Sequence, residues 1–200
     1  MRACASVLLA LSILAGCAGN PERAPASGYW DDHRQHLETL GNWTAVGKVA
    51  VRDSEQSESA TMKWQQSGAT ALINLSGPLG SGATRLHSDG STLTIERGGD
   101  SRRVDISSAE AVRASTGWDL PLQVLPFWLR GVPFPGSAIE DIHHDADSGR
   151  LLTLRQDGWD IHYEAYAVFD GFTLPTKLRM QRGESRATVL VRRWQTGATP

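Results

Sequence analysis

Short runs in which apolar and polar residues alternate dominate the chain from residue 42 to its end. In residues 43–51 and 60–65 every second residue is apolar or small, and nine later runs repeat the pattern at residues 71–75, 85–88, 93–97, 102–106, 138–143, 151–156, 159–166, 175–181 and 187–194. A period of two places alternate side chains on opposite faces of a β-strand. Turn signals such as Asp89-Gly90 and Gly98-Gly99 separate the runs. The pattern predicts a mainly β fold of about eleven short antiparallel strands, at the spacing typical of barrels and sandwiches.

Three segments follow a helical pattern instead. Residues 29–40 suit a short amphipathic helix with Trp30, Leu37 and Leu40 near one face. Residues 107–116 begin with serines suited to a helix cap and end before Gly117. Residues 120–129 are apolar on nearly all sides, so this helix must be buried or must cover an apolar space. Sequence alone leaves open whether it is ordinary core or a lid over a ligand.

The N-terminus reads as a targeting segment. Residues 7–14 form an apolar run after Arg2, and it is too short for a bilayer, which needs roughly 20 residues. Leu14-Ala15-Gly16-Cys17 resembles the lipobox of bacterial lipoproteins, although a secretory signal with a chance cysteine is the alternative. The lipobox implies cleavage before Cys17 and its modification by S-diacylglycerol and an N-acyl chain. We therefore expect residues 1–16 to be removed, residues 17–28 to form a lipidated flexible tether, and residues 29–200 to form one domain.

Composition narrows the class of protein further. The only other cysteine, Cys4, lies in the segment expected to be removed, so no disulfide is expected in the folded domain. The net charge is −2 and no basic stretch stands out along the sequence, which gives no support to nucleic-acid binding. Ala18 follows the lipidated cysteine in place of an aspartate; by analogy with the lipoprotein sorting rule, this implies a lipid-anchored protein of the outer membrane that faces the periplasm.

No enzyme motif accompanies these features. The sequence lacks Gly-x-Ser-x-Gly, His-Glu-x-x-His and a Gly-rich phosphate loop followed by Lys-Ser/Thr. His33 with His36, and His143 with His144, could hold a metal ion, but solvated surface histidines are the favoured interpretation. We expect no enzyme, no metal and no cofactor apart from the covalent lipid. A structural envelope lipoprotein without any cavity is an alternative function.

An ordered set of motifs resembles the LolB family, the outer-membrane receptor of the bacterial lipoprotein localisation pathway. The likeness runs from Trp30 to Trp194 and is carried by Gln65-Gln66 after Trp64, Gly77-Pro78-Leu79-Gly80, Gly117-Trp118 with Leu120-Pro121, Trp128-Leu129-x-Gly131-x-Pro133, Gln156-x-Gly158-Trp159-x-Ile161-x-Tyr163-x-x-Tyr166 and Leu174-Pro175. The resemblance implies a half-open antiparallel β-barrel with a helical lid or plug and an apolar cavity.

The resemblance also implies a function. Such a receptor accepts lipoproteins from a periplasmic carrier similar to LolA, holds their acyl chains in the cavity and inserts them into the outer membrane. Its partners are therefore the carrier, the cargo lipoproteins and membrane lipid, and we expect a monomer. We expect six apolar side chains to face inward, although core packing explains each of them nearly as well: Trp64, Leu75, Trp118, Leu122, Leu125 and Trp128.

A loop between two predicted strands carries a second candidate site. Pro78 fixes its own backbone angle, and the glycines at 77 and 80 permit a tight reversal that would hold Leu79 at a protruding tip. In LolB-like proteins the matching leucine acts in delivering cargo into the membrane. We therefore expect Pro78, Leu79 and Gly80 to form a membrane insertion loop.

Overall fold

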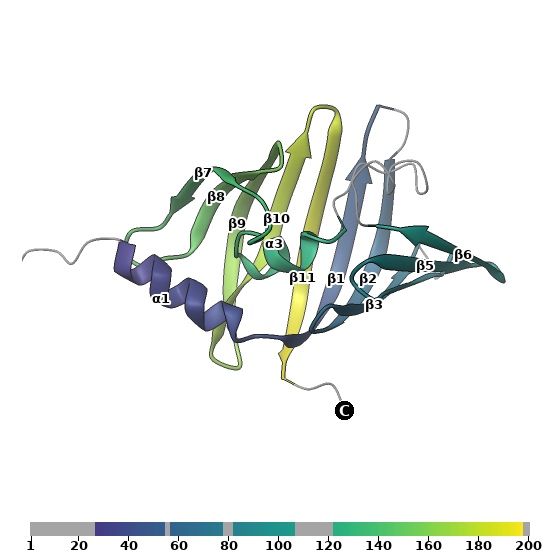
Figure 1. The fold of residues 1–200 in the computed structure, drawn as a ribbon, viewed down its shortest axis with the longest axis horizontal. Coiled ribbons are helices and arrows are strands. Elements are labelled where there is room, and N and C mark those ends of the chain that lie inside the picture. The colour runs from purple at the N-terminus through teal and green to yellow at the C-terminus, as the bar shows by residue number, and fades with distance from the viewer. Residues whose placement is uncertain (1–26, 55–56, 78–81, 107–121, 198–200) are drawn as a thin grey trace, which may run out of the picture.

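A single antiparallel sheet of eleven strands forms the body of the protein, in the order β6-β5-β4-β3-β2-β1-β11-β10-β9-β8-β7 (Figure 1). The computed structural model describes residues 27–54, 57–77, 82–106 and 122–197. The strands are β1 (Asn42–Arg52), β2 (Ser57–Ser67), β3 (Thr70–Ser76), β4 (Thr84–Ser88), β5 (Thr92–Arg97), β6 (Asp100–Asp105), β7 (Ile139–His144), β8 (Leu151–Gln156), β9 (Trp159–Phe169), β10 (Phe172–Arg182) and β11 (Ser185–Thr196). The mainly β prediction with about eleven antiparallel strands is confirmed.

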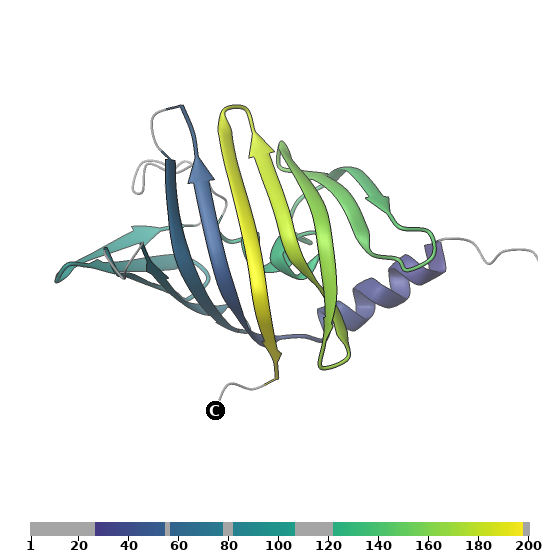
Figure 2. The same ribbon diagram turned by 180° about the vertical axis from the view of Figure 1, so that it is seen from behind.

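The sheet is coiled but does not close. Its order ends at β6 on one side and at β7 on the other, and these two strands are not paired with each other. Figure 1 shows helices α1 (Ser27–Glu38) and α3 (Leu125–Arg130) on the concave side. Figure 2 shows the convex side, where β2, β1 and β11 lie in front. The expected half-open barrel is therefore confirmed.

The centre of the sheet depends on one close backbone approach. The pairing of β1 with β11 shifts register between Val46 and Gly47, which leaves Arg192 as an extra residue on β11. Any side chain at position 47 would collide with the backbone carbonyl of Leu190, so only glycine fits there. This β-bulge increases the local twist and helps the sheet to coil.

Helix α1 (Ser27–Glu38) begins slightly before the expected start at residue 29, and its Leu37 is fully buried in the core. Helix α3 (Leu125–Arg130) is shorter than the predicted helix over 120–129, because residues 122–124 form turns. Gly131, with φ of 82°, ends it in a left-handed conformation. The helix predicted over 107–116 lies outside the described residues. No helix in the described ranges is long and apolar enough to cross a membrane.

Candidate functional site: an apolar cavity on the concave face

A cavity of about 500 Å³ lies between the concave face of β1–β5 and the segment that carries α3. This volume is within the range of pockets that bind small molecules, roughly 300–1,000 Å³. Its apolar lining consists of Trp43, Trp64, Ala71, Ile73, Leu86, Leu93, Ile106, Leu122, Pro126, Phe127 and Phe134. Strands β1–β5, Ile106 after β6 and the α3 segment thus build the site.

Strand register explains how these side chains come together. Trp64 on β2 lies opposite Ile73 on β3, and Ile73 lies opposite Leu86 on β4. Since cross-strand partners share a face, this row forms a continuous apolar wall. Trp43 on β1 packs against Trp64, with 5.9 Å between ring centroids. The alternating pattern in the sequence therefore becomes one side of the cavity.

The polar groups around the cavity already have partners within the protein. Trp64 Nε1 donates to Gln66 Oε1 at 2.8 Å, and Gln66 Nε2 donates to the Gly68 carbonyl at 2.9 Å. Gln123 Nε2 donates to the Gly90 carbonyl at 2.9 Å, and Ser88 Oγ accepts from the Gly90 amide at 3.0 Å. Because these groups are satisfied, the wall favours an apolar ligand over a polar one.

Arg130, at the end of α3, is a buried cation beside the cavity. It donates to the carbonyls of Leu40 (2.8 Å), Leu37 (3.4 Å) and Pro126 (3.1 Å), and its guanidinium lies 5.3 Å from the Phe127 ring centroid. Burial lowers the pKa of Arg130, while Glu38 acts in the opposite direction. The side chain joins α3 to the carbonyl end of α1 and so fixes both helices on the concave face.

Gln156 holds the other side of the α3 segment. This fully buried side chain accepts from Trp128 Nε1 and from the Phe134 amide, both at 2.9 Å. It donates to the carbonyls of Phe134 (2.8 Å) and Ser137 (3.0 Å). Tyr163 adds a bond from its hydroxyl to the Trp128 carbonyl at 3.0 Å. The motif around Gln156 and Tyr163 therefore fixes the segment that covers the cavity.

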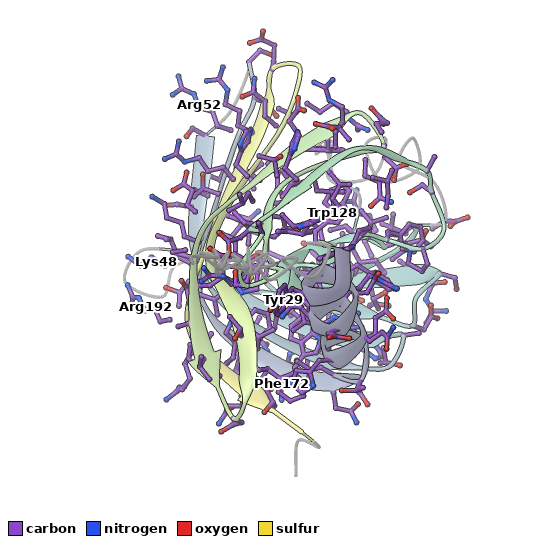
Figure 3. The ribbon with its side chains drawn as sticks, turned by 90° about the vertical axis from the view of Figure 1, so that its left-hand side faces the viewer. Tyr29, Lys48, Arg52, Trp128, Phe172 and Arg192 are labelled. Carbon is purple, nitrogen blue, oxygen red and sulfur yellow. The ribbon has the colours of Figure 1, made fainter. Side chains whose placement is uncertain are left out.

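The structure places the predicted cavity residues in three settings. Trp64 and Leu122 line the cavity. Leu125 and Trp128 are buried in the adjoining core, and Figure 3 shows Trp128 on the concave side of the sheet. Leu75 packs against the edge of the core and lines a second hollow of about 580 Å³ near the β3–β4 end. Trp118, the loop residues Pro78, Leu79 and Gly80, and Cys17 lie outside the described residues.

Several lining residues were not predicted. Ile73, Leu86 and Trp43 sit on strands whose alternation was recognised, so the period-two pattern could have identified them. Phe127 and Arg130 had no such signal, because residues 122–129 are almost uniformly apolar and give no preferred face. Within the described ranges, no three metal-ligating side chains gather, and the histidines at 33 and 36 form no metal site with a third ligand.

Solved structures define the class of fold. A LolA superfamily protein from Nitrosomonas europaea aligns over 88% of this chain and 95% of its own length, with a TM-score of 0.56 and 10% identity. A putative outer membrane lipoprotein-sorting protein domain from Vibrio parahaemolyticus aligns over 86% of this chain and 93% of its own length, with a TM-score of 0.55 and 10% identity. The open half-barrel is thus a fold shared with the LolA superfamily.

Sequence comparison then gives the particular family. Residues 41–194 match the family described as "Outer membrane lipoprotein LolB". The outer-membrane lipoprotein LolB of Stutzerimonas stutzeri is 39% identical over 188 residues, which cover 92% of this chain and 90% of that protein. The protein of the same name from Chromohalobacter salexigens is 38% identical over 192 residues, covering 94% of this chain and 88% of that protein. The chain belongs to the LolB family.

Proposed function

We propose that the protein is an outer-membrane-anchored receptor that accepts lipoproteins from a periplasmic carrier, holds their acyl chains in the concave cavity and inserts them into the outer membrane. As a member of the LolB family it is a lipoprotein transport receptor and not an enzyme. The observation that carries the acyl-chain part of the proposal is the cavity itself, whose wall is apolar and whose polar groups are already hydrogen-bonded. The proposal takes the protein as a monomer with no cofactor beyond the lipid on Cys17.

Transfer without nucleotide hydrolysis follows from differences in affinity. A lipoprotein cannot cross water with its chains exposed, since each buried methylene contributes about 0.8 kcal/mol. If the cavity of the receptor binds those chains more favourably than the carrier does, the equilibrium favours transfer of cargo to the receptor. A ligand shifts an equilibrium by the difference between its affinities for the two sites. The bilayer, which buries the chains completely, is the final and most favourable site.

The decisive experiment mixes the Cys17→Ala chain with a carrier loaded with a triacylated lipoprotein. We expect the lipoprotein to move to the receptor in solution, which co-purification after separation from the carrier would detect. Cargo that stays on the carrier under all conditions would contradict the proposed receptor function. A protein of the envelope with a purely structural role would fail this test.

Tryptophan fluorescence tests the cavity as the binding place. Trp43 and Trp64 line the cavity, whereas Trp159 is fully buried, packs near Trp128 and does not line it. A fatty acyl probe carrying bromine should quench the parent protein, and quenching should fall in a Trp43→Phe/Trp64→Phe variant. The matched Trp159→Phe variant should retain the quenching. Equal quenching losses in both variants would place the ligand elsewhere.

A further inference from the structure

Four cations from three distant parts of the sequence lie together on the convex face of the sheet: Lys48 on β1, Lys63 on β2, and Arg192 and Arg193 on β11. Lys63 is the cross-strand partner of Val46, and Val46 is also the partner of Arg193. Lys48 lies two positions further along β1 on the same face, and the bulge presents Arg192 beside Arg193. All four side chains are exposed. We call these residues the convex basic patch.

The convex basic patch faces away from the cavity. Figure 3 shows Lys48 and Arg192 extending from the side of the sheet opposite Trp128 and α1, with Arg52 further along the same side. Arg52 is the cross-strand partner of Arg186, so two arginines continue the positive face toward the end of β1. Like charges directly opposite each other destabilise a sheet. Their presence here favours an external anion that offsets the repulsion.

In the part of the chain that the structure describes, the four cations of the patch form no ion pair. On the same face, by contrast, Lys177 and Arg179 both pair with Glu164. The chain as a whole carries a net charge of −2, so this positive face is a local asymmetry and not a general property of the surface.

We propose that the convex basic patch docks the domain onto the anionic headgroups of the membrane to which the chain is tethered. The neighbours of the patch include the polar Thr61 and Asn74 and the aliphatic Val46 and Leu190, of which Leu190 is 41% exposed. The aromatic residues of β1, β2 and β11, Trp43, Trp64 and Trp194, are all buried, so these strands offer a protein partner no exposed aromatic anchor. Attraction to a charged bilayer needs only cations on an open surface.

The tether makes this contact reachable. Nine residues, 18–26, lie between the expected anchor at Cys17 and the start of α1 at Ser27, and the ten extended backbone steps from 17 to 27 span at most about 35 Å. The inference therefore rests on the tethered state proposed above. Docking by the convex face leaves the concave face open to the periplasm, where a carrier can present cargo. Since the contact is electrostatic, it is reversible and weakens with salt.

Vesicle flotation tests the proposal with the unlipidated Cys17→Ala chain and no cargo, so its result is separate from the acyl-chain function. We expect binding to phosphatidylethanolamine vesicles that contain phosphatidylglycerol, loss of that binding at high salt, and little binding to vesicles without phosphatidylglycerol. Each cation removed should weaken binding on the order of fivefold. The double variant Lys48→Gln/Arg192→Gln should therefore reduce vesicle binding strongly. The thermal unfolding temperature of the protein should stay unchanged, because both positions are exposed.

The matched control removes the same charge elsewhere. Arg102→Gln/Arg103→Gln changes two exposed arginines on the edge strand β6 and should retain most of the binding. The proposal would be overturned if the two double variants lost vesicle binding equally. Vesicle binding that does not depend on the phosphatidylglycerol content would overturn it as well. A patch variant that binds vesicles normally but no longer takes lipoprotein from the carrier would also overturn it, and would assign the face to a protein partner.

Discussion

At the scale of single residues, Gln156 shows how one buried amide can organise a site. Each of its two polar atoms makes two hydrogen bonds, so the side chain is fully satisfied although it is completely buried. Its partners lie on α3 and on the segment that leads to β7. Buried polar networks with every member paired specify a single arrangement. Gln156 thus determines where Phe134 meets the cavity.

Gln156→Leu should lower the free energy of unfolding by about 2–4 kcal/mol, because it leaves the buried Trp128 indole N–H and the Phe134 amide without a hydrogen-bond acceptor. Urea unfolding measures this change. Gln181→Leu is the matched control: this glutamine is exposed, its one bond to the Gly183 carbonyl is 3.4 Å long, and its loss should have little effect. Similar losses of stability in the two variants would show that the hydrogen bonds of Gln156 stabilise the fold no more than an exposed glutamine does.

The residue scale is also where sequence reasoning reached its limit. Trp64 was expected to face inward, and the structure places it in the lining of the cavity; strand alternation assigns a face to every residue of a strand. Trp128 and Phe127 are neighbours in an apolar helix, and periodicity could not tell that Phe127 lines the cavity while Trp128 enters the core. Arg130 gave no signal at all, since its role depends on the carbonyls of Leu37 and Leu40, which lie far away in the sequence.

At the scale of elements, α1 carries a histidine, His33, whose pKa is lowered in the folded protein. His33 is half-buried, and its Nε2 has no hydrogen-bond partner among the described residues. Burial lowers the pKa of His33, and the nearby His36 and Arg150 lower it further. In the unfolded chain a histidine titrates near its ordinary value of about 6.5. The folded state therefore binds this proton less readily than the unfolded state does.

The sign of the pH effect follows. The contribution of neutral His33 to stability is complete above about pH 6.5 and is lost as the pH falls from there toward the lowered pKa. The protection of α1 amides from hydrogen exchange, after correction for the intrinsic slowing of exchange at lower pH, should decrease over this range in the parent protein. His33→Phe removes the titration and should flatten the pH dependence of unfolding. An unchanged dependence in that variant would assign the effect to another group.

The loop between β3 and β4 carries the proposed membrane insertion residue, Leu79, outside the described ranges. Inserting one leucine into acyl chains gains on the order of 1.5–3 kcal/mol, too little to anchor a protein but enough to bring the cavity mouth to the bilayer. Leu79→Glu should therefore accept cargo from the carrier and fail to release it into liposomes, as sedimentation of the liposomes would show. Leu79→Met should behave like the parent. Normal release by Leu79→Glu would end the proposal.

The elements themselves were largely readable from the sequence. For strands separated by glycine turns, such as β5 and β6, the predicted bounds lie within one or two residues of the observed ones. In these places the alternation and the turn residues indicate the same boundaries. The helix predicted before Gly131 began too early, because an apolar run does not show at which residue the turns end and the helix begins. The convex basic patch could not be predicted from the sequence, because its members are separated by up to some 145 positions. Only the register of β2, β1 and β11 brings them together.

At the scale of the whole molecule, a single sulfur atom, that of Cys17, is expected to hold the protein at the membrane. Cys17→Ala should release a folded protein into the soluble periplasmic fraction, because the sulfur is the sole expected attachment point for lipid. Fractionation followed by a high-salt wash measures this; the wash also removes any electrostatic contact. A Cys4→Ala variant is the control and should remain in the membrane fraction. Sedimentation of the Cys17→Ala variant after the wash would contradict the lipobox interpretation.

The unpaired edges of the sheet, β6 and β7, give the molecule one further property. In a closed barrel the number of strands and their stagger fix the bore, so a larger guest can enter only if interstrand hydrogen bonds break. An open sheet has no fixed circumference. Small changes of twist spread over many strands can move one rim away from the other while every interstrand bond stays intact. We therefore expect the space inside the half-barrel to widen for a larger ligand without the loss of interstrand hydrogen bonds.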